Sequence, residues 1–261
     1  MSFLKKLKLP KIRFRSGALV CFWSVVMMGL LAFVEKRQSS KVCQLVSVTI
    51  DDEGNNHFID DADVNNLMTL NERENLIGES HHFIDLKQLE NRVKEHGFVE
   101  KVVVSKDLKG NIEVKVKQYR PIARLSLPNG NDRYISSIGK ILPLSSRFTA
   151  RVIVLDGPFT NVLSQKDWYK DSLRMPYFEF LGEVLKDDFL KVLVASANIN
   201  RKGEINIYPQ IGRQVIEFGL PENIPVKFSM MQTFYKKIIP VKGWNKYSKV
   251  SLKYKNQIVC E

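Results

Sequence analysis

The stretch FIDLKQLENRVKEHGFVEKVVVSKDLKGNIEVKVKQYRPIARL, residues 83–125, decides how the first half of this chain folds. Asp85 is a preferred helix N-cap, and Gln88 stands three residues later, where its side chain is able to bond back in a capping box. Gly97 occupies a position where a left-handed cap ends a helix. Between these signals apolar residues repeat along one helical face: Leu86, Leu89 and Val93. The pattern predicts an amphipathic helix that ends at Gly97.

Two strands are predicted after this helix. Residues 98–107 and 111–119 are rich in β-branched residues, and Gly110 supplies the turn between them. From Ile112 to Lys117, apolar and charged residues alternate. This alternation indicates a sheet with one dry face and one solvated face.

Upstream of the helix, residues 45–50 alternate like a first strand, and Asp60 precedes a short helical run over residues 61–68. The order strand, helix, helix, strand, strand, together with the stretch quoted above, resembles a POTRA domain. The closing YRPIARL, residues 119–125, resembles the join that follows this domain in the FtsQ/DivIB family of bacterial cell division proteins. That family commonly has a Trp after a Pro where this chain reads GFVEKV. The resemblance implies a POTRA domain over residues 44–119 and a domain join at Arg120, Pro121, Ile122, Ala123 and Arg124.

Short strands and turns dominate the sequence from residue 120 to residue 261. Residues 133–144 have the pattern of a hairpin, and a helix is predicted to begin at Met175, because the following Pro176 is tolerated in a first turn. Three successive strands are predicted within residues 190–219. The fold class predicted for the whole chain is α+β: a single-pass membrane anchor, a POTRA domain of β-α-α-β-β order, and a mixed β domain with a few helices over residues 120–261.

The last predicted helix and strand lie within residues 221–261. Pro240 is expected to end the helix, whose apolar stripe is formed by Phe228, Met231, Tyr235 and Ile238. The following KYSKVSLKYKNQIVCE, residues 246–261, alternates apolar and polar residues, which predicts a strand from Lys249 to Val259 with an open edge. An open edge exposes unpaired N–H and C=O groups, and lysines along it discourage self-pairing.

Residues 218–260 are similar to the C-terminal region of the FtsQ/DivIB family in their helix, in the break after it, and in the final VSLKY strand. The resemblance implies FtsB- and FtsL-like division proteins as partners. An extended segment is able to add to an exposed sheet edge as a further strand. We therefore expect an FtsB-like strand to bind at Lys249, Val250, Ser251, Leu252, Lys253 and Tyr254. A secondary partner surface is expected at Tyr235, Trp244 and Tyr247.

The first 34 residues predict a membrane anchor. Residues 16–34 carry no charge, and at about 1.5 Å per residue they are close in length to the ~30 Å hydrocarbon core of a bilayer. The excess of Lys and Arg within residues 1–15 predicts a cytoplasmic tail, so that residues 35–43 form a spacer and both domains are extracytoplasmic, in the periplasm. A cleaved signal peptide is the competing interpretation, although no small-x-small site follows Val34.

Charge and motifs narrow the class of function. The net charge is +12, but six basic residues before Glu35 supply half of it, and no basic stripe follows, so nucleic-acid binding is not expected. The sequence contains no GxSxG, GxxxxGK[ST] or HExxH motif. No catalytic, cofactor-binding or metal-binding residue is predicted, and the adjacent His81 and His82 are expected in a solvated loop. Cys43 and Cys260 are either paired in an oxidising compartment or two free thiols.

The resemblance implies a non-enzymatic scaffold of the bacterial division machinery. Such a protein lies in the cytoplasmic (inner) membrane at the septum, links early and late division proteins through the FtsB/FtsL subcomplex, and helps to control septal peptidoglycan synthesis. The alternative is a membrane-anchored extracytoplasmic enzyme or ligand-binding protein with an unrecognised site. A POTRA protein of outer-membrane assembly fits less well, because the chain lacks a run of amphipathic barrel strands.

Overall fold

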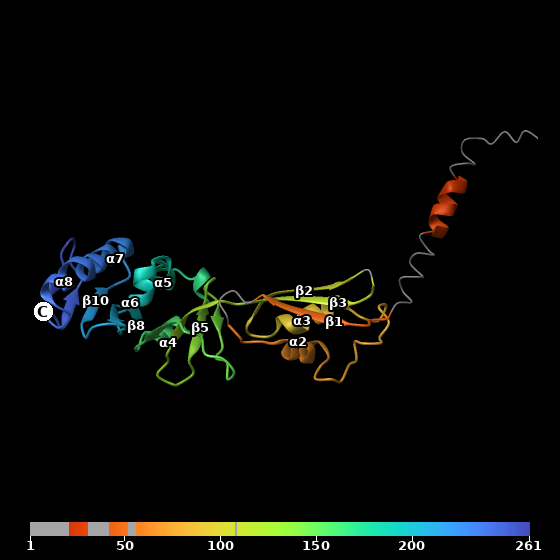
Figure 1. Cartoon of the computed structure of the whole chain (residues 1–261), viewed down its shortest axis with the longest axis horizontal. Coiled ribbons are helices and arrows are strands. Elements are labelled where there is room, and N and C mark those ends of the chain that lie inside the picture. The colour runs from red at the N-terminus through yellow and green to blue at the C-terminus, as the bar shows by residue number, and fades with distance from the viewer. Residues whose placement is uncertain (1–20, 31–41, 52–55, 108) are drawn as a thin grey trace, which may run out of the picture.

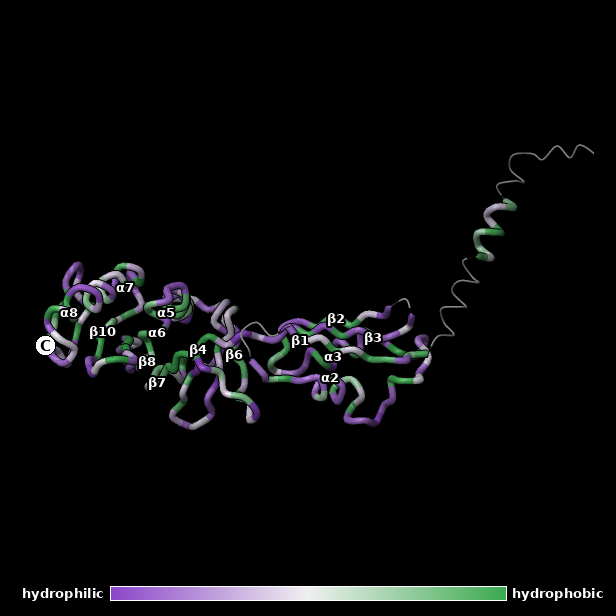
Figure 2. Tube along the Cα trace, viewed as in Figure 1, coloured by the Kyte–Doolittle hydropathy of each residue, from purple (hydrophilic) through white to green (hydrophobic). Residues whose placement is uncertain are grey.

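The computed structural model describes residues 21–30, 42–51, 56–107 and 109–261. Residues 21–30 are helical and carry no charge (Figure 2). Within these described ranges, no helix has both the length and the apolar character needed to cross a bilayer. The predicted basic tail, both ends of the predicted anchor and most of the spacer lie outside the described residues.

The first domain has the strand, helix, helix, strand, strand order that the sequence predicts. Its sheet has the strand order β1-β3-β2, with β1 parallel and β2 antiparallel to the central β3. Residues from both helices and all three strands share one apolar core, which includes Met68, Val93 and Ile112. The elements are β1 (Val46–Asp51), α2 (Asp61–Met68), α3 (Leu86–Lys94), β2 (Val99–Lys106) and β3 (Ile112–Gln118).

The ends of the two helices differ from the prediction in detail. The Asp85 carboxylate accepts hydrogen bonds from the backbone N–H groups of Lys87 and Gln88, so its role as N-cap of α3 is confirmed. The reciprocal capping box occurs at α2 instead, between Asp60 and Asp63. The left-handed cap predicted at Gly97 is wrong: its φ is not positive, and the helix is capped by Glu95 in right-handed conformation.

The reason for a glycine at position 97 is a close contact with the second domain. A Cβ atom at Gly97 would lie 2.8 Å from Cγ of the Pro143 ring, closer than real Cβ contacts come. The glycine therefore permits an approach between segments far apart in the sequence, which a local pattern cannot reveal.

The second domain is built on a mixed sheet of nine strands, in the order β12-β11-β10-β9-β8-β7-β4-β5-β6. The pairs β4–β7, β7–β8 and β10–β11 are parallel, and the other neighbours are antiparallel. This arrangement confirms the predicted α+β class with a mixed sheet. The strands are β4 (Pro121–Leu125), β5 (Arg133–Ser136), β6 (Ile141–Leu142), β7 (Ile153–Asp156), β8 (Val194–Ile199), β9 (Ile205–Pro209), β10 (Val215–Gly219), β11 (Lys249–Ser251) and β12 (Val259–Cys260).

Helices from this domain pack on the sheet through one large core that includes Trp168, Phe180 and Phe228. The strand predicted to start near Leu190 begins at Val194, because Asp187 caps a short helix in front of it. The helical elements are α4 (Thr160–Leu163), η1 (Trp168–Lys170), α5 (Met175–Lys186), α6 (Asp188–Leu193), α7 (Ile224–Thr233), η2 (Phe234–Ile238) and α8 (Ile239–Lys242).

Pro240 does not end the last helical segment, contrary to the prediction. A π-helical turn, η2, follows α7, and Pro240 then falls in the first turn of α8, which continues to Lys242. Proline is tolerated at that point because the N–H groups of a first turn have no partner within the helix. The wide turn therefore lets the chain pass the proline without a break.

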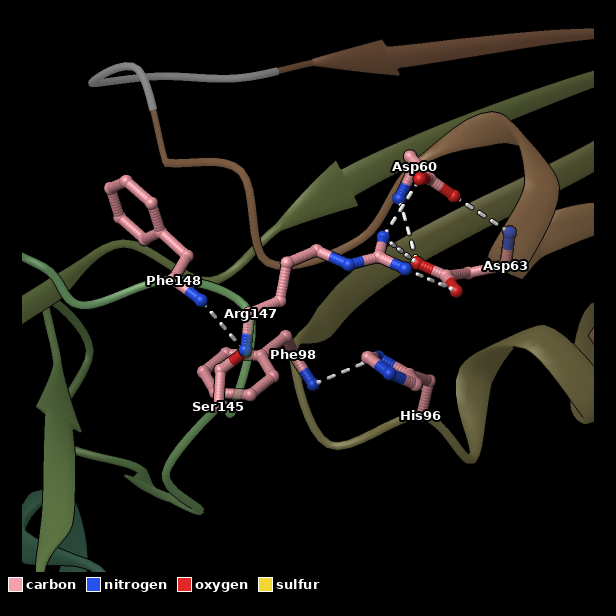
Figure 3. A network of polar contacts seen from close by, with 7 residues as sticks. All are labelled: Asp60, Asp63, His96, Phe98, Ser145, Arg147 and Phe148. Atoms are coloured by element: carbon pink, nitrogen blue, oxygen red, sulfur yellow. Dashed lines mark hydrogen bonds and ion pairs between the residues drawn. The ribbon is translucent and has the colours of Figure 1, made fainter.

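The two domains lie end to end along the long axis of the molecule (Figure 1). An aromatic cluster joins them: the Phe58 ring stacks on Phe98 at 4.2 Å between centroids, and Phe148 of the second domain meets Phe58 edge-on at 5.0 Å. Beside it, the Arg147 guanidinium pairs with Asp60 at 2.8 Å and with Asp63, at the start of α2 (Figure 3). Apolar packing and the ion pairs of Arg147 thus lie at the same joint.

Candidate functional site

The end of the nine-stranded sheet differs from the predicted open strand. β11 ends at Ser251, the chain turns through residues 252–258, and β12 returns antiparallel, with Val250 opposite Cys260. The turn contains Asn256 at φ +57°, a conformation that asparagine adopts more readily than most residues. β11 therefore lies between β10 and β12, and the prediction that it forms the open edge is wrong; the edge strand is β12.

The pairing of β12 decides which backbone groups it offers to solvent. The N–H of Glu261 donates to the carbonyl of Lys249 at 3.0 Å, and the N–H of Lys249 donates to the carbonyl of Glu261 at 3.2 Å. In antiparallel sheets such bonded pairs alternate with non-bonded pairs, in which both residues point their backbone groups away from each other. The opposed pair Val250 and Cys260 is of the second kind. The N–H and C=O of Cys260 consequently face the open side of the sheet.

The six predicted partner-binding residues support this edge rather than form it. Val250, Ser251 and Leu252 are buried. Their charged neighbours are engaged within the domain, because Lys249 pairs with Glu217 at 2.9 Å and Lys253 pairs with Glu204 at 3.5 Å. The Glu217 carboxylate raises the pKa of Lys249, which stays charged at neutral pH. Of the six, Tyr254 has the most exposed apolar side chain.

The predicted secondary surface is only partly accessible. Tyr235 belongs to the core: its ring is buried, its hydroxyl accepts a hydrogen bond from Gln214 at 3.1 Å, and burial raises its pKa to about 12. Its inclusion in a partner surface is therefore wrong. Trp244 is 46% exposed and lies 6.1 Å from the Tyr235 ring, whereas Tyr247 is half-buried against the core.

Other residues near this end of the sheet were missed by the sequence reasoning. Val241 has 78% of its surface exposed, and it stands just beyond the proline that was expected to end the helix. Val259 and Cys260 form the true edge, and only the turn-forming Asn256 signals that the strand reverses before them. Exposed lysines accompany these apolar side chains: Lys242, Lys246 and Lys255.

Of the predicted domain join, Arg120, Pro121 and Ile122 line a cleft, whereas Ala123 and Arg124 do not. Pro121, Ile122 and Ala123 are buried in β4, while Arg124 forms an ion pair with Asp132 at 2.7 Å. Arg120 lines a cleft of about 500 Å³ together with Arg151 and Lys191. The cleft therefore has a basic rim over an apolar floor.

Side chains of the types that bind metals or act as nucleophiles are dispersed among the described residues. No group of three His, Cys, Asp or Glu residues there has the arrangement of a metal site. Cys43 and Cys260 are both free thiols. Burial raises the pKa of each thiol above its usual value, so both stay protonated at neutral pH and are weak nucleophiles.

Comparison with known families agrees with this architecture. A family described as "FtsQ/DivIB, C-terminal related" matches residues 120–261, more than half of the chain. A POTRA-like domain matches residues 41–117. None of the curated proteins is similar enough to the chain to be matched with it. Membership of the family suggests a scaffold role in cell division, a place at the septal membrane, and other division proteins as partners. The chain therefore belongs to the FtsQ/DivIB family and carries a POTRA-like domain in front of the C-terminal domain that matches this family.

Proposed function

We propose that this protein is a single-pass membrane scaffold of the division machinery that does no chemistry itself and captures FtsB- and FtsL-like proteins in the periplasm. The family match over residues 120–261 is the observation that carries the proposal. The anchor rests on the uncharged residues 16–34, and the cytoplasmic N-terminus rests on the basic residues before them. Through its contacts the protein would link early and late division proteins and influence septal peptidoglycan synthesis.

The geometry of β12 supports capture by strand addition. The outward N–H and C=O of Cys260 are one donor and one acceptor in the positions that a further antiparallel strand uses. Main-chain bonds of this kind supply affinity, while side-chain contacts supply selectivity. The partner strand would therefore bind on β12, with residues Lys249 to Tyr254 supporting it from behind.

The side chains around β12 indicate which kinds of side chain a complementary partner strand has. Val241, Trp244, Tyr254 and Val259 expose apolar surface at this end of the domain, and exposed lysines accompany them. An extended partner segment with apolar residues and acidic flanks would be complementary to this surface. Since rim charges act mainly on the association rate, we expect capture to be faster at low salt.

The proposal is tested by removing only the backbone N–H of Cys260, which faces the open side of the sheet. Cys260→Pro deletes the N–H that faces the open side and leaves the bonds between Lys249 and Glu261 in place. We expect it to abolish co-purification with the FtsB- and FtsL-like proteins of the same genome, while the circular dichroism spectrum is unchanged. Cys260→Ser keeps the donor, removes the same thiol and should bind normally.

Unchanged co-purification of Cys260→Pro, with its fold intact, would contradict strand addition at β12. Ser251→Pro is unsuitable for this purpose. Ser251 lies between β10 and β12, so proline there would break the ladder inside the sheet and unfold it.

A second candidate function rests on the cleft at the domain join. Its rim of Arg120, Arg151 and Lys191 would suit an anionic ligand, as in an anchored ligand-binding protein. Depletion of the protein separates the two functions. Filamentous cells with unsplit septa support the scaffold, whereas normal septation with a metabolic defect supports ligand binding.

A further inference from the structure

The end of the POTRA-like domain that faces away from the nine-stranded sheet exposes a group of large apolar side chains. Phe83 is 75% exposed, Ile77 61%, Leu45 55% and Val42 43%. We call these four residues the apolar tip. None of the four belongs to the apolar core of the domain. A group of exposed apolar side chains is typical of a surface that contacts a membrane or another protein.

Backbone hydrogen bonds hold the segments of the apolar tip together. Cys43, next to Val42, donates to the carbonyl of Glu79 at 2.9 Å and accepts from the N–H of Gly78 at 2.7 Å. The carbonyl of Leu45 accepts from Ile112, at the start of β3, at 2.9 Å. The strand that begins the domain and the segment before α3 are therefore neighbours.

The loop that carries Phe83 is also fixed. The N–H of Phe83 donates to the carbonyl of Ser80 at 3.0 Å, and the Lys106 ammonium donates to the carbonyl of His81 at 2.7 Å. Phe83 is thus presented outward by a structured turn. The same end of the domain carries the exposed Lys109, which suits an anionic surface.

The short segment between the predicted anchor and Val42 identifies the bilayer as the surface that the apolar tip contacts. The predicted anchor ends at Val34, and Val42 follows eight residues later. Eight residues span at most about 29 Å when fully extended, so this end of the domain cannot leave the neighbourhood of the bilayer. In Figure 1 the same end of the domain, where β1 begins, is the one remote from the nine-stranded sheet.

We propose that the apolar tip rests on the surface of the bilayer that holds the anchor, with Phe83 inserted among the lipid headgroups. Aromatic side chains are favoured at that depth, and apolar area buried there adds to the binding free energy. The contact would hold the long axis of the molecule at a fixed inclination to the membrane. The inference rests on the membrane anchor of the proposed function.

The test uses the full chain reconstituted in vesicles of phosphatidylcholine and phosphatidylglycerol. The acyl chains of these lipids are brominated near the headgroup, because bromine quenches tryptophan fluorescence only at contact. In a Trp23→Phe background, Phe83→Trp places a reporter on the apolar tip, and Val241→Trp places one at the far end of the molecule. The two sites are matched in exposure, 75% and 78%. The remaining Trp168 and Trp244 are the same in both variants.

We expect the reporter at position 83 to lose most of its emission in brominated vesicles and the reporter at 241 to lose none. Equal emission of the position 83 reporter in brominated and ordinary vesicles would overturn the inference. A blue shift of the position 83 emission without any quenching by bromine would overturn it too, since it would mean contact with protein, such as a second copy. The native Trp23 reports on the anchor separately, in vesicles brominated deep in the acyl chains, because it lies seven residues inside the predicted span. If bromine at that depth does not quench it, the anchor fails, whatever position 83 does.

Discussion

Ser251 is a buried polar residue in β11, and its hydroxyl has a direct consequence for the free energy of unfolding. The Oγ atom is buried and has no hydrogen-bond partner among the described residues. A buried hydroxyl without a partner destabilises the folded state by its desolvation. We expect Ser251→Ala to raise the free energy of unfolding by about 1 kcal/mol in urea titrations. A clear loss of stability in this variant would mean that the hydroxyl has a partner.

The imidazole ring of His96, at the joint between the domains, predicts that the stability of the fold depends on pH. Burial lowers the pKa of His96, the Arg147 charge lowers it further, and the Asp63 carboxylate opposes the shift. Its Nδ1 atom accepts a hydrogen bond from the N–H of Phe98 at 3.4 Å, which requires the neutral ring (Figure 3). Because the folded-state pKa lies below the ordinary value of about 6.5, protons bind first to the unfolded chain as the pH falls.

Stability should therefore be fully present above pH 6.5 and should decline as the pH falls from there toward the folded-state pKa of His96. Carboxylates with lowered pKa, such as Asp60, act only at more acidic pH. We expect urea titrations to show this first decline in the native chain and to show much less of it in His96→Asn. An identical decline in both proteins would contradict the assignment to His96.

The turn between β11 and β12 is the element on which the proposed edge depends. Asn256 adopts φ +57°, and a β-branched residue is disfavoured there by about 1–2 kcal/mol. We expect Asn256→Val to loosen β12 and to speed hydrogen exchange at the amides of Lys249 and Glu261 about fivefold or more, since 1 kcal/mol corresponds to that factor. Asn256→Gly should exchange like the native chain. Equal protection in all three would mean that β12 pairs independently of the turn.

At the scale of elements, sequence predicts well where local signals agree. The Asp85 cap, the repeat of Leu89 and Val93, and the alternation from Ile112 identify the POTRA-like order, because each is a property of neighbouring residues. The sequence misplaces the edge strand because alternation continues from Val250 to Tyr254, although β11 ends at Ser251 and β12 pairs outside it. A strand's neighbours depend on contacts distant in sequence, and no local pattern contains them.

The joint between the domains is the feature of the whole molecule that sets its extended form. Phe58 is buried between Phe98 and Phe148, so Phe58→Ala should destabilise the joint by roughly 3–5 kcal/mol. We expect small-angle X-ray scattering to show a broader distribution of interdomain distances. Arg147→Ala removes the ion pairs with Asp60 and Asp63, whose side chains are all partly exposed, so it should cost only about 1 kcal/mol and leave the scattering unchanged. Native-like scattering of Phe58→Ala would show that the aromatic cluster does not set the shape.

The end-to-end arrangement also has a consequence for which proteins are able to reach β12. If the anchor and the edge strand lie at opposite ends of a stiff body, a partner tethered to the same bilayer needs a stalk about as long as that body (Figure 1). A shorter stalk gives an effective concentration near zero at the edge, and a much longer flexible one dilutes its binding segment. The length of the molecule would then select partners by the length of their stalks, before side-chain contacts at β12 contribute to selectivity.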